Sequence, residues 1–180
     1  MKITTLIFTL LFTVAGVSAQ KKTTTSGAIN FDATTSMDAL PKAENKAVVA
    51  ALDTKTGGIA FEAIMKNFSF ANPMMQGHFN SVSWIDSDKF PTATFKGKIT
   101  NLASVDFSKD GTYAAEVSGD LKIHGITKPI NARGVIIVTG KSIAASAAFT
   151  IKVEDYGITG KAIEAGKVNK APKITVAINF

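Results

Sequence analysis

The sequence predicts an all-β fold, a single extended antiparallel barrel of about eight strands. From Thr23 onward, apolar and polar residues alternate with a period of two, which is typical of strands with one buried face. Short glycine-containing turn signals separate these alternating segments. Cysteine is absent, so packing and hydrogen bonds alone must hold the fold. A barrel is favoured over a sandwich, because closure of the sheet removes the exposed edges.

The first residues have the layout of a cleaved secretory signal peptide, residues 1–19. A lysine precedes an apolar stretch over residues 3–17, and the small side chains of Val17 and Ala19 fit cleavage after Ala19. A membrane-spanning helix needs roughly 20 strongly apolar residues, whereas this stretch is shorter and contains threonines. No cysteine follows it, which excludes a lipid-anchored lipoprotein. We therefore expect a periplasmic or secreted protein.

The alternating segments are expected to form one domain, residues 26–180, after a flexible stub at residues 20–25. The clearest alternation runs over residues 113–123, where apolar side chains share one face and polar side chains the other. The remaining strands are expected at residues 27–32, 47–53, 58–66, 93–102, 129–138, 143–153 and 173–180.

Residues 67–90 interrupt this alternation and gather aromatic and methionine side chains. Pro73 is placed to open a short helical segment near residues 72–80. The gathered side chains are either ordinary core, which composition alone favours, or a pliable lining for an apolar ligand.

The predicted buried faces are rich in small side chains, which a barrel of this size can use in two ways. They either allow close packing and a plug, or they leave space for one small ligand, and composition does not separate these readings. The small residues are Ala63, Gly97, Ala115, Gly119, Ala132, Gly134, Ala145 and Ala147.

Groups suited to catalysis or metal binding are few. His78 and His124 are the two histidines, they are far apart in sequence, and neither sits in a catalytic or metal-binding motif. His124 precedes Gly125 at an expected turn, where a structural hydrogen bond is the favoured role. Nucleophile-elbow, phosphate-loop and dinucleotide motifs are absent. We expect no enzyme activity, metal or catalytic cofactor; an enzyme acting through His78 is the opposing hypothesis.

The charge pattern indicates a solvated surface. The formal net charge is +6, but the lysines are scattered singly and basic blocks with interleaved aromatic residues are missing. We therefore expect no nucleic-acid partner. A weak, transient attraction to an anionic membrane surface fits the positive charge.

Three groups of motifs, in register over residues 26–180, resemble the YceI-like family of polyisoprenoid-binding periplasmic proteins. The order and spacing of all three agree with the family pattern. The first group is His78-Phe79, Trp84-Ile85-Asp86 and the run from Lys89 to Phe95; the second is the run from Gly119 to Ile130; the third is Phe149-Thr150-Ile151 with Asp155-Tyr156-Gly157-Ile158.

The resemblance implies a lipocalin-like barrel whose apolar tunnel takes a polyprenyl chain or an isoprenoid quinone. The protein would then carry or sequester this isoprenoid lipid in the periplasm, and a homodimer is compatible with the family. The alternative is a filled barrel, a stress-related or redox-associated protein-interaction module without a lipid ligand. Ligand contacts are expected from Phe61, Phe68, Phe70, Met74, Met75, Phe79, Trp84, Phe95, Tyr113 and Phe149.

Overall fold

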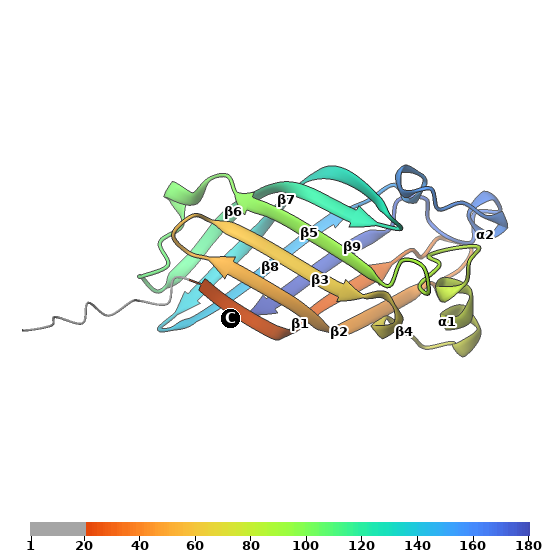
Figure 1. Ribbon diagram of the computed structural model, residues 1–180, viewed down its shortest axis with the longest axis horizontal. Coiled ribbons are helices and arrows are strands. Elements are labelled where there is room, and N and C mark those ends of the chain that lie inside the picture. Colours follow the sequence, from red (N-terminus) through yellow and green to blue (C-terminus); the bar gives the residue numbers. More distant parts are fainter. Residues whose placement is uncertain (1–20) are drawn as a thin grey trace, which may run out of the picture.

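Eight strands close into an antiparallel barrel in the computed structural model, which describes residues 21–180 (Figure 1). Their order around the barrel is β1-β9-β8-β7-β6-β5-β3-β2, and pairing of β2 with β1 completes the ring. The short β4 pairs with one end of β2. The predicted all-β barrel is confirmed, whereas the predicted signal peptide, residues 1–19, lies outside the described residues.

Tight turns join β2 to β3, β6 to β7 and β7 to β8, whereas longer segments with short helices join β4 to β5 and β8 to β9. The strands are β1 (Lys21–Asp32), β2 (Lys42–Asp53), β3 (Gly58–Ile64), β4 (Ser69–Phe70), β5 (Thr92–Ile99), β6 (Gly111–Ile123), β7 (Ile126–Thr139), β8 (Ser142–Thr150) and β9 (Lys173–Asn179). The helices are η1 (Met65–Asn67), α1 (Pro73–Asn80), η2 (Leu102–Ser104), η3 (Val153–Tyr156) and α2 (Lys161–Glu164).

The first strand is longer than its alternation predicts. β1 begins at Lys21, so residues 21–25, which we expected to form a flexible stub, are part of the sheet. Residues Lys21 to Thr24 pair with residues Asp53 to Ala50 of β2. The paired segment therefore begins six residues before residue 27, where we expected the strand to start. The threonine run is β-branched and suits a strand once a partner is available. Pairing with β2 therefore orders the segment.

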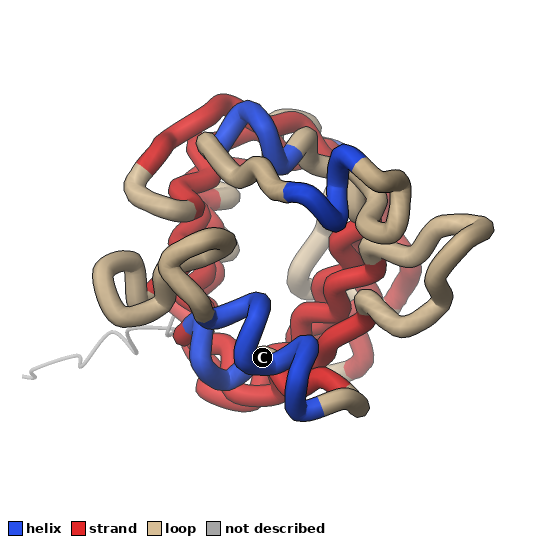
Figure 2. Tube along the Cα trace, turned by 90° about the vertical axis from the view of Figure 1, so that its right-hand side faces the viewer, coloured by secondary structure: helices blue, strands red, loops and turns tan. Residues whose placement is uncertain are grey.

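The two ends of the barrel differ (Figures 1 and 2). One end carries α1, α2 and η3, together with the connection between β1 and β2; we call it the helix end. The opposite end carries the β2–β3 and β7–β8 hairpin turns, and we call it the turn end. Among the described residues, no helix is long and apolar enough to cross a membrane.

α1 is the short helix predicted near residues 72–80. Asn72 caps it, because its side-chain oxygen accepts a hydrogen bond of 2.9 Å from the backbone N–H of Met74. Pro73 occupies the first turn, where a missing N–H has no cost. The backbone N–H of Phe70 donates to Oε1 of Gln76 at 3.1 Å, which ties β4 to the helix.

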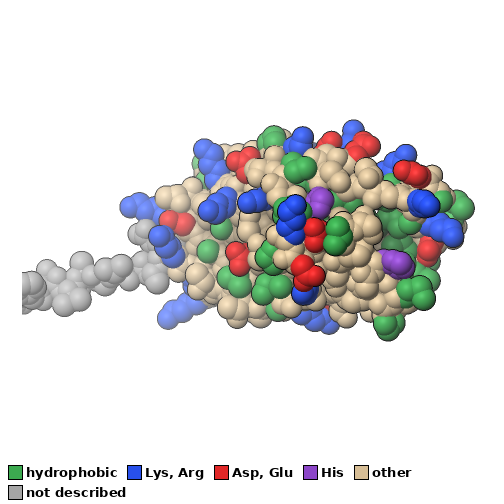
Figure 3. All heavy atoms as spheres, turned by 45° about the vertical axis from the view of Figure 1, so that its right-hand side comes forward, with side chains coloured by type: hydrophobic (Ala, Val, Ile, Leu, Met, Phe, Trp, Pro, Cys, Tyr) green, Lys and Arg blue, Asp and Glu red, His purple; other side chains and the backbone are tan. Residues whose placement is uncertain are grey.

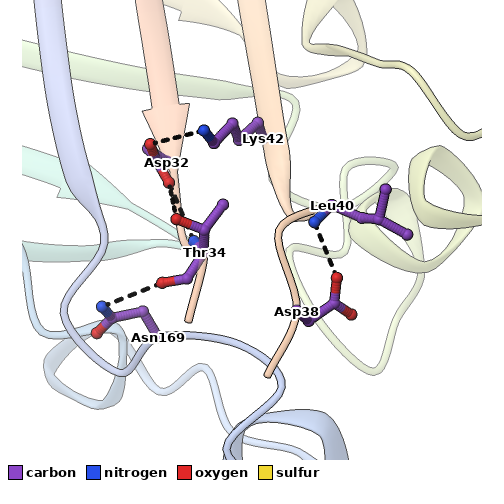
Figure 4. A network of polar contacts seen from close by, with 6 residues as sticks. All are labelled: Asp32, Thr34, Asp38, Leu40, Lys42 and Asn169. Atoms are coloured by element: carbon purple, nitrogen blue, oxygen red, sulfur yellow. Dashed lines mark hydrogen bonds and ion pairs between the residues drawn. The ribbon is translucent and has the colours of Figure 1, made fainter. Parts of the chain in front are cut away.

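A polar network fixes the connection between β1 and β2 at the helix end (Figure 4). Oδ1 of Asp32 accepts hydrogen bonds from the backbone N–H and the hydroxyl of Thr34, at 3.0 and 2.7 Å. Lys42 lies 3.6 Å from the other carboxylate oxygen. The backbone N–H of Asn169 donates to the carbonyl oxygen of Ala33 at 2.8 Å. The network thus joins the first connection of the chain to the segment that leads into β9.

The turn end of the barrel is packed solid by what we call the turn-end cluster. Its buried side chains come from β2, β5, β6, β7 and β8 and from the loop before β6. The buried members are Leu52, Ile99, Val105, Ala115, Ile136, Val138 and Ile143.

Candidate ligand-binding cavity

The barrel encloses a cavity of about 160 Å³ between the turn-end cluster and the helix end. A single water needs only about 10–15 Å³ on a comparable measure, so the space is far larger than a packing defect. Inward-facing side chains of every barrel strand except β2 line it. The interior is therefore hollow over part of its length and filled at one end.

Small inward residues create this hollow. Six of the eight predicted small residues line the cavity, and in a sheet of this curvature larger side chains would meet across the bore. These six are Ala63, Ala115, Ala132, Gly134, Ala145 and Ala147. Gly97 and Gly119 do not line it; instead, the ring of Phe95 lies over both. Both interpretations of the small residues therefore apply: six of them leave space for a ligand, and the two glycines allow close packing of an aromatic ring.

Six of the ten predicted contact residues line the cavity. They come from β3, β5, β8 and the segment that contains α1: Phe61, Phe68, Phe79, Trp84, Phe95 and Phe149. Whether they contact a ligand stays a prediction.

The other four predicted residues lie away from the cavity wall. Phe70 packs behind Phe79, with ring centroids 5.0 Å apart. Met74 is 71% exposed on α1, and Met75 lies on the same helix without reaching the cavity. Tyr113 faces inward but lies beside the turn-end cluster, where its hydroxyl donates to the carbonyl oxygen of Lys109 at 2.9 Å. Tyr113 is thus on the inward face of β6 but too close to the turn end to line the cavity.

Sequence reasoning missed the aliphatic part of the lining. The prediction selected aromatic and methionine residues, whereas much of the wall is isoleucine at inward positions of the same alternation. Examples are Ile29, Ile59, Ile123, Ile130 and Ile174. The period-two pattern itself was the signal that could have found them.

Phe79 is the centre of an aromatic cluster at the helix end. Its ring lies 5.7 Å from Trp84, 5.7 Å from Phe68 and 6.0 Å from Phe31, between ring centroids. These separations and tilted orientations are those that aromatic pairs favour. Phe79 and Trp84 are both core and cavity wall, so the cluster bounds the hollow without filling it. Figure 3 shows hydrophobic side chains gathered around a hollow at this end of the molecule.

The cavity wall carries no charged side chain. Nearby, Tyr156 is buried, and burial raises the pKa of its phenol to about 12, so the phenol stays neutral at physiological pH. A ligand inside the cavity would gain affinity by burying apolar area, at about 25 cal/mol per Å² before ordering costs. The site is suited to a hydrocarbon chain.

His124 has a structural position at the turn between β6 and β7. Both His124 and Gly125 have positive φ, at 51° and 76°, as a tight two-residue hairpin turn requires. The Nδ1 atom of His124 lies 2.9 Å from the carbonyl oxygen of Tyr156, and since a carbonyl can only accept, Nδ1 carries the proton. Its ring also meets Phe90 edge to face, with centroids 4.5 Å apart. This is the structural hydrogen bond that the sequence predicts.

His78 is exposed on α1 and does not line the cavity. Within residues 21–180, no group of three or more His, Asp, Glu or Cys side chains is placed to hold a metal ion.

The fold and the cavity together define a closed antiparallel barrel of the lipocalin-like kind with an apolar interior. Residues 8–180 match the model of the YceI-like domain, and the chain belongs to the YceI-like family.

Two curated relatives match part of the chain. A UPF0312 protein of Pseudomonas putida (strain F1) is 32% identical over 89 residues, which cover 46% of this chain and 43% of the relative. A UPF0312 protein of Pseudomonas fluorescens (strain Pf-5) is 34% identical over 64 residues, 36% of this chain and 31% of the relative. The matched part of the chain thus spans less than half the length of these relatives.

Solved structures share the fold at low sequence identity. A polyisoprenoid binding domain from Saccharophagus degradans has a TM-score of 0.73 at 13% identity, covering 89% of this chain and 97% of that one. BcnA of Burkholderia cenocepacia has a TM-score of 0.72 at 16% identity, covering 86% and 96%. The YCEI protein of Campylobacter jejuni has a TM-score of 0.54 at 16% identity, covering 100% and 93%. At these identities the likeness supports the barrel fold alone.

Proposed function

We propose that this protein binds a long isoprenoid lipid, a polyprenyl chain or an isoprenoid quinone, inside the barrel and carries or sequesters it in the periplasm. The observation that carries the proposal is the cavity of about 160 Å³ with an uncharged, aliphatic and aromatic wall. Membership of the YceI-like family and the likeness to a polyisoprenoid binding domain support the same ligand class.

The test is uptake of a polyprenol or a polyprenyl quinone by the purified protein, followed by the fluorescence of Trp84. Trp84 is the one tryptophan of the chain and lines the cavity, so a bound chain changes its surroundings. Saturable binding of either probe is expected. A protein that remains folded and takes up neither probe would contradict the proposal and favour the filled-barrel alternative.

A matched pair of variants localises the binding. Ala147 lines the cavity, whereas its neighbour Ala148 is exposed on the outer face of β8. Ala147→Phe should lower uptake at least about tenfold by occupying ligand space, and Ala148→Phe should leave it unchanged. Equal behaviour of the two folded variants would place the ligand outside the barrel.

We also propose that the protein does not catalyse a reaction of the bound lipid. The cavity wall presents no carboxylate, imidazole or amine that could move a proton. Incubation with a polyprenyl quinone should therefore return the ligand unchanged, as read by mass spectrometry of the extracted lipid. Formation of a product that His78→Ala abolishes would instead establish the enzyme hypothesis.

Location in the periplasm rests on the signal-peptide layout of residues 1–19. Expression of the full chain should give a mature protein that begins at Gln20 and is released with the periplasmic fraction. An uncleaved amino terminus in the cytoplasm would contradict this part of the proposal.

The helix end is the side that would contact a membrane transiently. Large apolar side chains are exposed on its connecting segments: Met37, Leu40, Met74 and Val82. The segments at this end, residues 33–41, 65–91, 124–125 and 151–172, carry six lysines and six acidic residues, so they have no net charge. Apolar insertion, and not attraction to anionic lipid, would then drive the contact.

Sedimentation with zwitterionic phosphatidylcholine vesicles tests this contact. Val82→Ser combined with Met74→Ser should lower the bound fraction several-fold, whereas Val135→Ser on the outer face of β7 should not. Binding to vesicles that contain anionic lipid, without binding to phosphatidylcholine vesicles, would show instead that charge drives the contact.

A further inference from the structure

We propose that the turn-end cluster is the floor of the cavity and sets the length of lipid chain that the barrel accepts, with Ile136 and Ala115 as the specificity-determining residues. This inference rests on the proposed function. It goes further by assigning which end of the cavity is blind and which side chains limit the ligand.

The boundary of the cavity runs through the turn-end cluster. Ile99, Ala115 and Ile136 belong to the cluster and also line the cavity. Leu52 and Val138 belong to the same cluster, are 1% and 2% exposed, and do not line it. The bore is therefore filled immediately beyond Ile136, and a chain inside the cavity must end there.

Several lining side chains near the helix end are partly open to solvent. The inward side chain of Ile130, about 20 Å further along β7 at ~3.3 Å per residue, is only partly buried, whereas that of Ile136 is 3% exposed. Phe149 and Trp84, which line the cavity nearer the helix end, are also only partly buried. Together with the hollow at the helix end in Figure 3, these partly open side chains indicate that a ligand enters from the helix end and extends toward Ile136.

The ladder places the two specificity-determining residues near the same level of the bore. Ala115 pairs with Gly134 across β6 and β7, and Ile136 lies two residues further along β7, opposite Ala145 of β8. Three of these four positions carry no more than a methyl side chain, so Ile136 supplies the bulk of the cavity wall at this level. Its partner on β6, Tyr113, belongs to the packing beyond the wall and does not line the cavity. Removing that bulk deepens the cavity, and adding bulk at Ala115 makes it shallower.

Two variants with opposite effects test the floor. The probes are all-trans polyprenols that differ by one isoprene unit, and the readout is the dissociation constant as a function of chain length. Ile136→Ala should shift the tightest-binding chain to a longer homologue, and Ala115→Leu to a shorter one. Each shift should change the ratio of affinities for adjacent homologues by at least about tenfold, which corresponds to burying about two more or two fewer methylene groups of the chain.

Matched controls lie on the outer face of the same strands. Ile137 is 46% exposed and Ala114 is exposed, and neither lines the cavity. Ile137→Ala and Ala114→Leu should leave the chain-length profile unchanged. If Ile136→Ala fails to fold, Ile136→Val makes the same test with a smaller change in volume.

The outcomes separate this inference from the proposed function. If the unmodified protein binds no polyprenol of any length, the proposed function fails. If it binds polyprenols but the profile is flat, or the profile stays fixed in folded Ile136→Ala and Ala115→Leu proteins, only the floor is overturned. Opposite shifts in the two variants establish it.

Discussion

Gly97 of β5 and Gly119 of β6 are direct partners across the ladder, and the ring of Phe95 covers both. A Cβ atom on Gly97 would lie 2.6 Å from Cζ of Phe95, and one on Gly119 would lie 2.7 Å from the same atom. The ring also stacks on Phe61 with centroids 5.8 Å apart. The glycine pair therefore lets one aromatic side chain lie flat along the barrel wall instead of projecting into the cavity.

Gly119→Ala should destabilise the protein by about 1–3 kcal/mol, because the new methyl group displaces the Phe95 ring and meets the backbone of β5. Urea unfolding measures the change. Gly77→Ala in α1 is the control, since no atom lies within 4 Å of its Cβ position and alanine favours a helix. It should leave stability unchanged or raise it by up to about 1 kcal/mol; equal losses in both variants would contradict the packing role of the glycine pair.

Phe79→Ala should lower the free energy of unfolding by about 3–5 kcal/mol, because Phe79 is buried and meets four aromatic rings. The near-ultraviolet circular dichroism of Trp84 should weaken at the same time, since its edge-to-face partner is lost. Met74→Ala on the exposed side of α1 should change stability by less than about 0.5 kcal/mol. A small effect of Phe79→Ala would show that the helix end is only loosely packed.

Asn72→Ala should cost about 1 kcal/mol, because it removes the side-chain acceptor for the first turn of α1. Asn72→Asp keeps an acceptor at the same position and should retain most of the stability. Thermal unfolding of the three proteins gives the comparison. Loss of stability in both variants to the same extent would place the role of Asn72 elsewhere than in capping.

Acid should weaken the network around Asp32. The hydrogen bond from the Thr34 hydroxyl is the largest cause that holds the pKa of Asp32 below its ordinary value of 3.8, with Lys42 contributing as well. A lowered pKa in the folded state means that this stabilisation is complete above pH 3.8 and is lost as the pH falls through the lowered value. The carboxylate is 41% exposed, so the contribution is screened and amounts to less than about 1 kcal/mol.

Thr34→Ala and Asp32→Asn test this dependence by unfolding at neutral and acidic pH. Both should be less stable than the unmodified protein at pH 7, and the difference should shrink below pH 3.8. A difference that stays constant with pH would assign the effect to packing instead of charge.

The strands of this fold were predictable because each barrel strand has one buried and one solvated face, so that apolar and polar residues alternate along its sequence. Closure was predictable only as a preference. The pairing of β1 with β9 joins residues more than 140 positions apart, such as Ala28 and Ala177, and no local pattern encodes it. Residues 21–25 form part of a strand and not a flexible stub because residues 21–24 pair with the end of β2, a contact that their own sequence does not reveal.

The candidate site was predictable in part. Aromatic residues at inward positions, such as Phe61 and Phe149, line the cavity, because alternation identifies the face on which a side chain lies. Alternation does not give the depth of a residue along the bore, which is why Tyr113 falls beside the filled end. Selection by side-chain type also favoured Met74, which the helix turns toward solvent.

The last strand along the chain stands between β1 and β8, so the first strand cannot acquire both neighbours until residues 173–179 have emerged from the ribosome. Until then two strand edges remain bare, and bare edges invite pairing with other molecules. A chain assembled in this order completes its barrel only after the last strand is available. The order of strands around the ring thus couples completion of synthesis to completion of structure.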